Sequence, residues 1–144
     1  MKKVLVLALA FAAAQVFAQT SPVGLWKTVD DKSGKEKSLV RIAETNGVLS
    51  GKIEKLLDPS VKQDEVCDKC KDSRKDKPVL GLLIIEGVKK SSDTLWEGGQ
   101  ILDPNNGEVY KVRLTPAEGG KKLDVRGYIG MPMLGRTQTW IRVE

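Results

Sequence analysis

Stretches in which apolar and polar residues alternate recur along this chain, for example at 49–54, 110–114 and 123–127. A period of two places neighbouring side chains on opposite faces of a β-strand, one row toward a core and the other toward water. Residues that favour tight turns stand between such stretches: Asn46-Gly47, Ser91-Ser92-Asp93, Asn105-Asn106-Gly107 and Gly119-Gly120. These residues adopt the positive φ angles of short hairpins, so the sequence predicts strands joined mostly by hairpins.

The predicted strands cover eight segments: 23–29, 37–45, 48–56, 80–87, 94–102, 108–115, 121–129 and 136–143. An antiparallel meander of this size leaves two unpaired edges unless the sheet closes, and a closed barrel holds either its own side chains or one small ligand. We therefore expect an all-β fold, an eight-stranded up-and-down antiparallel barrel. A two-sheet β-sandwich is the alternative, because alternation does not decide closure. A short helical turn within 58–78 is also compatible with the sequence.

The N-terminal segment has the features of a signal peptide. A basic start, Met1-Lys2-Lys3, precedes an apolar stretch at 4–14 that is too short to span a bilayer comfortably, and Val16 and Ala18 suit cleavage after Ala18. The cut would leave Gln19 first, and because this residue is not cysteine, no lipid anchor is expected. Residues 1–18 are thus predicted to be removed. Residues 19–144 would form one periplasmic or secreted domain with no membrane span.

Charge argues against nucleic acid as a partner. The chain has 24 Lys and Arg residues against 19 Asp and Glu residues, and the predicted signal peptide accounts for two of the lysines. The remaining charges are interspersed along the whole length, which is typical of a hydrated surface and not of a stripe that follows a phosphate backbone.

The segment Gly24-Leu25-Trp26 resembles the opening of lipocalin-like barrels, in which the tryptophan plugs the closed end beneath a basic side chain of the last strand. Arg142 is the candidate for that partner, and Trp26 and Arg142 would together close the barrel. A guanidinium over an indole face contributes about 0.5–2 kcal/mol. The alternative is that Trp26 is simply a large core side chain.

A second resemblance extends over nearly all of the predicted mature chain. The matching segments are Gly24-Leu25-Trp26-Lys27-Thr28, Cys67-Asp68-Lys69-Cys70, Lys77-Pro78-Val79-Leu80-Gly81, Gly99-Gln100-Ile101-Leu102-Asp103-Pro104, Val125-Arg126-Gly127-Tyr128-Ile129-Gly130 and Leu134-Gly135-Arg136-Thr137-Gln138-Thr139-Trp140. In these segments the chain resembles a bacterial exported family known as domain of unknown function 2147. The resemblance implies a lipocalin-like barrel outside the cytoplasm and no established activity.

The two cysteines, Cys67 and Cys70, lie in the long connection at 58–78. In an oxidising compartment we expect them to form a disulfide, which by the chain-entropy formula contributes about 2 kcal/mol for so short a loop. Redox activity and metal binding are the alternatives. A redox pair usually opens a helix, and zinc needs four ligands, whereas this chain has no histidine and no second pair of cysteines.

The chain contains no histidine, which excludes Ser-His and Cys-His catalytic arrangements and removes the commonest metal ligand. No spacing of carboxylates marks a catalytic pair, and no cofactor motif is present. An enzyme is therefore less favoured than a binding protein, and no cofactor is expected.

The connection at 128–134 stays apolar where polar residues are usual. A barrel interior with this apolar rim would hold a small apolar or amphipathic ligand; its candidate contacts are Trp96, Tyr110, Tyr128, Met131 and Met133. Arg113 and Arg126 are candidate charge anchors, although their positions in the alternation favour an outward direction. The alternative function is a filled barrel that contacts a protein partner in the cell envelope.

Overall fold

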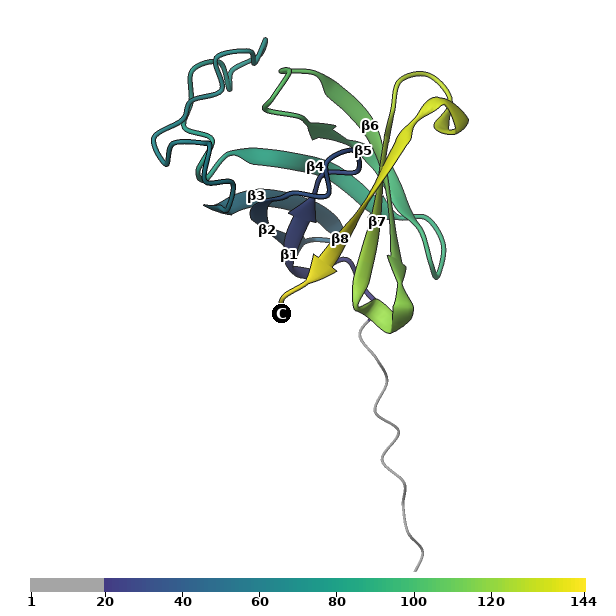
Figure 1. The fold of residues 1–144 in the computed structure, drawn as a ribbon. Helices are drawn as coiled ribbons and strands as arrows, with labels where there is room; N and C mark the ends of the chain where they lie inside the picture. Colours follow the sequence, from purple (N-terminus) through teal and green to yellow (C-terminus); the bar gives the residue numbers. More distant parts are fainter. Residues whose placement is uncertain (1–19) are drawn as a thin grey trace, which may run out of the picture.

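The computed structural model describes residues 20–144, which form one closed antiparallel barrel whose strands pair in chain order (Figure 1). The elements are β1 Gly24–Val29, β2 Glu36–Thr45, β3 Val48–Leu56, β4 Leu83–Lys90, β5 Trp96–Leu102, β6 Val109–Ala117, η1 Glu118–Gly120, β7 Lys122–Tyr128, η2 Pro132–Leu134 and β8 Arg136–Arg142. The predicted eight-stranded barrel is confirmed, and the β-sandwich alternative is wrong. Residues 58–78, all of them described, contain no helix. The predicted signal peptide, 1–18, lies outside the described residues.

Strand β4 differs most from its prediction: it spans Leu83–Lys90, three residues further along the chain at both ends than the predicted 80–87. Gly81 has a φ of +86°, a left-handed conformation that ends an extended strand and that glycine adopts at low cost. Two backbone hydrogen bonds hold this turn against β3: Gly81 N donates to Ile53 O at 2.7 Å, and Ile53 N donates to Leu82 O at 3.1 Å. The chain therefore turns through Gly81 before β4 begins at Leu83.

Alternation decides which side chains fill the barrel. Val40 and Ile42 on β2 and Val112 and Leu114 on β6 are each no more than 1% exposed, whereas their neighbours along the strands are more exposed. Burial of side chains of this size contributes roughly 1.5–3 kcal/mol each. The inward row thus forms most of the buried core of the described residues.

Trp26 and Arg142 lie together at the closed end of the barrel. The Trp26 side chain is fully buried, its Nε1 donates to Pro22 O at 2.7 Å, and the Arg142 guanidinium lies 4.2 Å from the centre of its ring. Arg142 also donates to three backbone carbonyls, those of Ser21, Val23 and Gly120, at 2.5–2.8 Å. Burial lowers the pKa of Arg142 from its usual value. The hydrogen bonds to the three carbonyls replace the hydrogen bonds to water that the guanidinium loses on burial.

The seam that closes the barrel joins β1 to β8 and is short. Only two residue pairs are in register there, Trp26 with Arg142 and Lys27 with Ile141. Backbone bonds beyond β8 extend the seam, because Leu25 N donates to Glu144 O and Val143 N donates to Leu25 O, both at 2.8 Å. Side-chain packing at Trp26 therefore supplements a ladder with few hydrogen bonds.

Candidate functional site

A cavity of about 840 Å³ opens at the end of the barrel away from Trp26 and Arg142. Its apolar wall comes from inward-facing side chains of several strands: Ile53, Leu56, Ile84, Leu102, Val125 and Trp140. The connections between β1 and β2, β3 and β4, β5 and β6, and β7 and β8 surround its mouth, at the top of Figure 1. Volumes of about 300–1,000 Å³ are typical of pockets for small organic molecules.

Gly127 leaves room in this wall. It stands in the inward row of β7, after Leu123 and Val125, and pairs with Val112 on β6. A β-carbon at Gly127 would lie 3.5 Å from the Tyr110 β-carbon and 3.8 Å from a methyl group of Ile101, which are ordinary contacts. The space that a side chain would occupy here is instead part of the cavity.

The polar groups inside the cavity already have hydrogen-bond partners. The hydroxyls of Thr28 and Ser38 lie 2.9 Å apart across β1 and β2, and Ser38 N donates to Thr28 Oγ1 at 3.1 Å. Trp140 Nε1 donates to Gln138 Oε1 at 3.0 Å. The wall can therefore face an apolar ligand without leaving these groups unpaired.

Asp58 is a buried carboxylate in the wall, with only 6% of the residue exposed. Lys37 Nζ lies 2.8 Å from Asp58 Oδ2, and Ser60 donates to Oδ1 through its backbone N–H at 3.0 Å and its hydroxyl at 2.7 Å. The Lys37 ammonium, followed by the Ser60 hydrogen bonds, holds the pKa of Asp58 well below its usual range. The carboxylate is therefore ionised at neutral pH.

Arg136 and Asp31 form a second ion pair at the mouth. Arg136 Nη2 and Nε lie 2.5 and 3.1 Å from the two carboxylate oxygens of Asp31, which is the bidentate arrangement that guanidinium groups favour. The hydrogen bond from Arg136 lowers the pKa of Asp31. This pair connects the β1–β2 turn to the start of β8.

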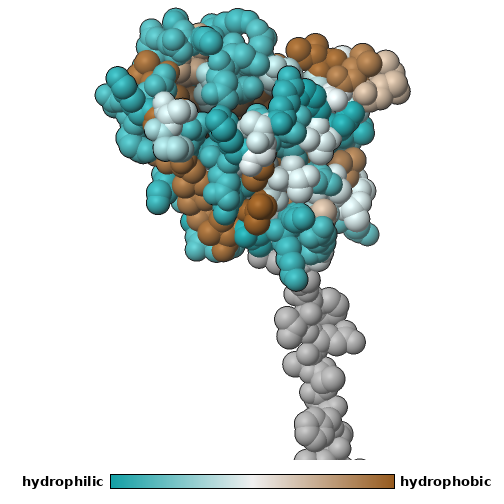
Figure 2. Space-filling model, viewed as in Figure 1, coloured by the Kyte–Doolittle hydropathy of each residue, from teal (hydrophilic) through white to brown (hydrophobic). Residues whose placement is uncertain are grey.

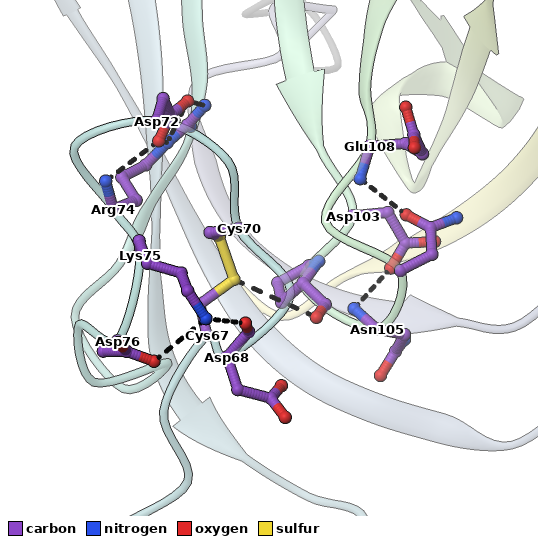
Figure 3. Close-up of a disulfide and its surroundings, with 12 residues drawn as sticks. Cys67, Asp68, Cys70, Asp72, Arg74, Lys75, Asp76, Asp103, Asn105 and Glu108 are labelled. Atoms are coloured by element: carbon purple, nitrogen blue, oxygen red, sulfur yellow. Dashed lines mark hydrogen bonds and ion pairs between the residues drawn. A yellow bond between two sulfur atoms is a disulfide. The ribbon is translucent and has the colours of Figure 1, made fainter.

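The 57–82 connection forms one side of the cavity mouth, and the Cys67–Cys70 disulfide lies within it (Figure 3). The predicted disulfide is confirmed. Both cysteines are at most 2% exposed and belong to the buried core of the described residues. Cys67 Sγ lies 4.0 Å from Pro104 O in the β5–β6 turn. The disulfide therefore packs the connection against that turn.

Replacing Cys67 and Cys70 with alanine should lower the free energy of unfolding by about 2 kcal/mol and leave the barrel folded. The bridge restricts only a short loop, and the strand ladders do not depend on it. Denaturant unfolding followed by near-ultraviolet circular dichroism measures the loss. Amide exchange at Val79, whose N–H donates to Glu65 O at 2.9 Å, should accelerate, because this bond lies within the released connection. Loss of cooperative unfolding would contradict this prediction.

Two of the ligand contacts proposed from the sequence, Tyr110 and Tyr128, line the cavity. Asn106 Nδ2 donates to the Tyr110 hydroxyl at 3.0 Å. Trp96 does not line the cavity. It is the first residue of β5, pairs in register with Leu114 and lies near the closed end of the barrel. Lys90 Nζ lies 5.4 Å from the centre of its ring.

Met131 and Met133 also stay outside the cavity wall, because η2 turns them toward solvent, where they are 54% and 71% exposed. Together with Ile129 and Leu134 they form an exposed apolar group, which we call the β7–β8 tip; it is visible as the brown surface at the upper right of Figure 2. Ile129 and Leu134 also line the cavity mouth.

The two arginines considered as anchors point away from the cavity. Arg113 Nε lies 2.8 Å from Glu97 Oε2. Arg126 donates to Pro132 O at 2.6 Å and to Thr137 Oγ1 at 2.8 Å, and so fixes the β7–β8 connection from outside.

Sequence reasoning missed Trp140, Gln138 and Asp58 as cavity residues. Alternation along β8 could have identified the first two, since Gln138 and Trp140 share the inward row with Arg142. Asp58 could not have been found in this way, because it follows a strand in an irregular connection.

No helix in the described residues 20–144 has the length and apolar character needed to cross a membrane. The same part of the chain holds no group of three or more cysteine, aspartate or glutamate side chains placed to bind a metal ion.

Comparison with known proteins identifies the family. Residues 24–142 match the family described as "Uncharacterized protein conserved in bacteria (DUF2147)". No curated protein sequence gave a significant match. Among solved structures, protein HP1028 from the human pathogen Helicobacter pylori, which belongs to the lipocalin family, is similar with a TM-score of 0.75 and 20% identity, over 88% of this chain and 85% of that one. The chain therefore belongs to the DUF2147 family of uncharacterized bacterial proteins and has a lipocalin-like barrel fold.

Proposed function

We propose that this protein is an exported binding protein that holds one small apolar or amphipathic molecule in its barrel. The cavity of about 840 Å³ carries the proposal. A barrel filled by its own side chains would leave no space of this size. Satisfied polar groups and buried aliphatic side chains in the wall suit an apolar ligand body, and the charged mouth suits a polar end.

Export is part of this proposal. The N-terminal signal-peptide pattern, the disulfide and the membership of a bacterial family support a periplasmic or secreted location. In that compartment a soluble carrier or sensor of a poorly soluble molecule would need a shielded interior such as this cavity.

A cavity-filling substitution tests the ligand site. Leucine in place of Gly127 should weaken binding of N-phenyl-1-naphthylamine, a neutral fluorescent apolar probe, at least tenfold, because its side chain would occupy the space beside Tyr110 and Ile101. Gly127 is outside the left-handed region, so the backbone accepts leucine without strain. Fluorescence titration measures the affinity, and circular dichroism checks the fold.

The matched control is Lys111→Leu on the adjacent strand β6, where the side chain is exposed and outside the cavity wall. It should bind the probe as the wild type does. Wild-type protein that binds no apolar probe, or equal affinities for wild type and Gly127→Leu, would contradict the proposed function.

The β7–β8 tip favours a second function, contact with a protein partner in the cell envelope. Its four apolar side chains are 54–74% exposed, more than a surface usually presents in one place. Met131→Asp with Met133→Asp separates the two functions. The double variant should keep the affinity for N-phenyl-1-naphthylamine, because neither methionine lines the cavity, and should lose any envelope contact that depends on the tip.

A further inference from the structure

The charges that line the cavity have a different balance from those of the chain as a whole. Six carboxylates line it: Asp30, Asp31, Asp58, Glu65, Asp68 and Asp103. Only four cations do so: Lys32, Lys37, Lys69 and Arg136. The whole chain has the opposite excess, 24 basic residues against 19 acidic ones. The mouth is therefore an acidic region of a basic protein.

The two cations that are fixed in place are already paired. Arg136 is held by Asp31 through two bonds, and Lys37 lies 2.8 Å from the buried carboxylate of Asp58. An anionic ligand group would have to displace a carboxylate that is closer and better oriented. Neither cation is thus available as a counter-ion for a bound anion.

The other four carboxylates form no ion pair within the described residues, although Lys37 acts through space on Asp30, and Arg136 on Asp30 and Asp103. Asp30 accepts hydrogen bonds from the backbone N–H groups of Lys32 and Ser33, and Asp103 accepts one from Asn105, which orients both groups but leaves their charge. Glu65 and Asp68 have exposed side chains. Against these four, only Lys32 and Lys69 remain, both exposed.

We propose that the cavity selects amphipathic molecules by the charge of their polar end, accepting positively charged or uncharged ends and disfavouring anionic ones. This inference rests on the proposed function, since it requires the apolar part of the ligand to lie in the barrel. An ammonium group at the mouth meets unpaired carboxylates, whereas a carboxylate or sulfate loses water there without gaining a counter-ion. The Tyr110 side chain in the wall adds an aromatic surface that attracts cations.

Three probes, each with an unbranched chain of twelve carbons, test the selection. They are dodecyltrimethylammonium, dodecyldimethylamine oxide, which carries no net charge near neutral pH, and dodecanoate. Titration calorimetry below the aggregation concentration of each probe measures the affinities of the mature protein. The cation should bind at least tenfold more tightly than the anion, with the uncharged probe between them, and 0.5 M NaCl should reduce the difference because it screens exposed charges.

Variants locate the effect at the mouth. Glu65→Gln with Asp68→Asn should reduce the preference for the cation over the anion at least threefold, because two exposed carboxylates are removed from the cavity lining. Glu44→Gln with Asp93→Asn changes the net charge equally at exposed hairpin positions outside the lining, and should leave the preference unchanged.

The outcomes separate this inference from the proposed function. Binding of none of the three probes would contradict the proposed function itself. Binding of all three with the anion equal to or tighter than the cation would overturn the charge selection and leave the ligand-binding barrel in place. Equal effects of the two double variants would also overturn it, since net charge alone would then explain the preference.

Discussion

Replacing Trp26 with alanine should lower the free energy of unfolding by about 3–5 kcal/mol, as truncation of large buried aromatic side chains does. The Trp26 side chain is fully buried and lies under the Arg142 guanidinium at the seam between β1 and β8, where only two residue pairs are in register. The alanine variant would leave a void at this seam and a partly buried guanidinium without its aromatic surface. Urea unfolding followed by near-ultraviolet circular dichroism measures the change.

Two further variants show whether the closed end acts as a unit. Arg142→Lys should cost about 1–3 kcal/mol, because a single ammonium cannot serve all three carbonyls that the guanidinium now reaches. Lys27→Ala is the control: it removes a partly exposed ion pair with Glu36 on the outer face of the same strand and should cost less than 1 kcal/mol. A Trp26→Ala variant no less stable than Lys27→Ala would disprove this account of closure.

Alanine at Gly107 should destabilise the protein by about 2–5 kcal/mol, from left-handed strain and overpacking together. Gly107 has a φ of +74°, and a β-carbon there would overlap the backbone carbonyl of Lys69, next to the disulfide. The β5–β6 turn and the 57–82 connection could then no longer pack together. Amide exchange at Val79 should accelerate with the loss of stability, because that amide lies in the displaced connection.

Gly34→Ala is a closely matched control. Gly34 also has a positive φ, +70°, but no atom lies within 4 Å of the position that a β-carbon would take. This variant should show the backbone strain alone, about 1–2 kcal/mol, so the excess at Gly107 measures the packing of the connection. Equal losses at the two glycines would mean that the contact with Lys69 contributes nothing.

Because the connection at 57–82 lines the cavity, Gly107→Ala should also weaken binding of an apolar probe. Stability and binding are therefore linked at this turn. Trp26 lies at the end of the barrel away from the cavity mouth. Trp26→Ala should therefore lower the stability of the fold more than the ligand affinity of the molecules that remain folded.

Most of the barrel could be predicted because its signals are local. Alternation and turn residues depend on neighbouring positions, and they located all eight strands, most of them within two residues of the observed ends. The exception was β4, where Val79, Leu80 and Leu82 continue an apolar run and resemble a strand in sequence. Hydrogen bonds from β3 to the turn at Gly81 decide that boundary, and they come from residues far away in the chain.

The candidate site could be predicted only in part, for the same reason. Tyr110 belongs to a regular strand, so its position in the alternation predicts that its side chain points into the barrel. Asp58 and the cysteines lie in a connection without a period, and their burial depends on contacts with β2 and with the β5–β6 turn. The methionines of the β7–β8 tip are apolar, yet η2 turns them to solvent.

The sequence by itself determined the strand order, the hairpins, the cysteine pairing and the family, since each is encoded in short segments or in their order along the chain. Only the tertiary structure decided that the sheet closes and that its interior is partly empty. Closure depends on the pairing of β1 with β8, the two ends of the described chain. The cavity depends on how completely side chains fill the barrel. Gly127, which has no side chain, and the packed connection at 57–82 border the same space, and no local sequence pattern relates these two parts of the chain.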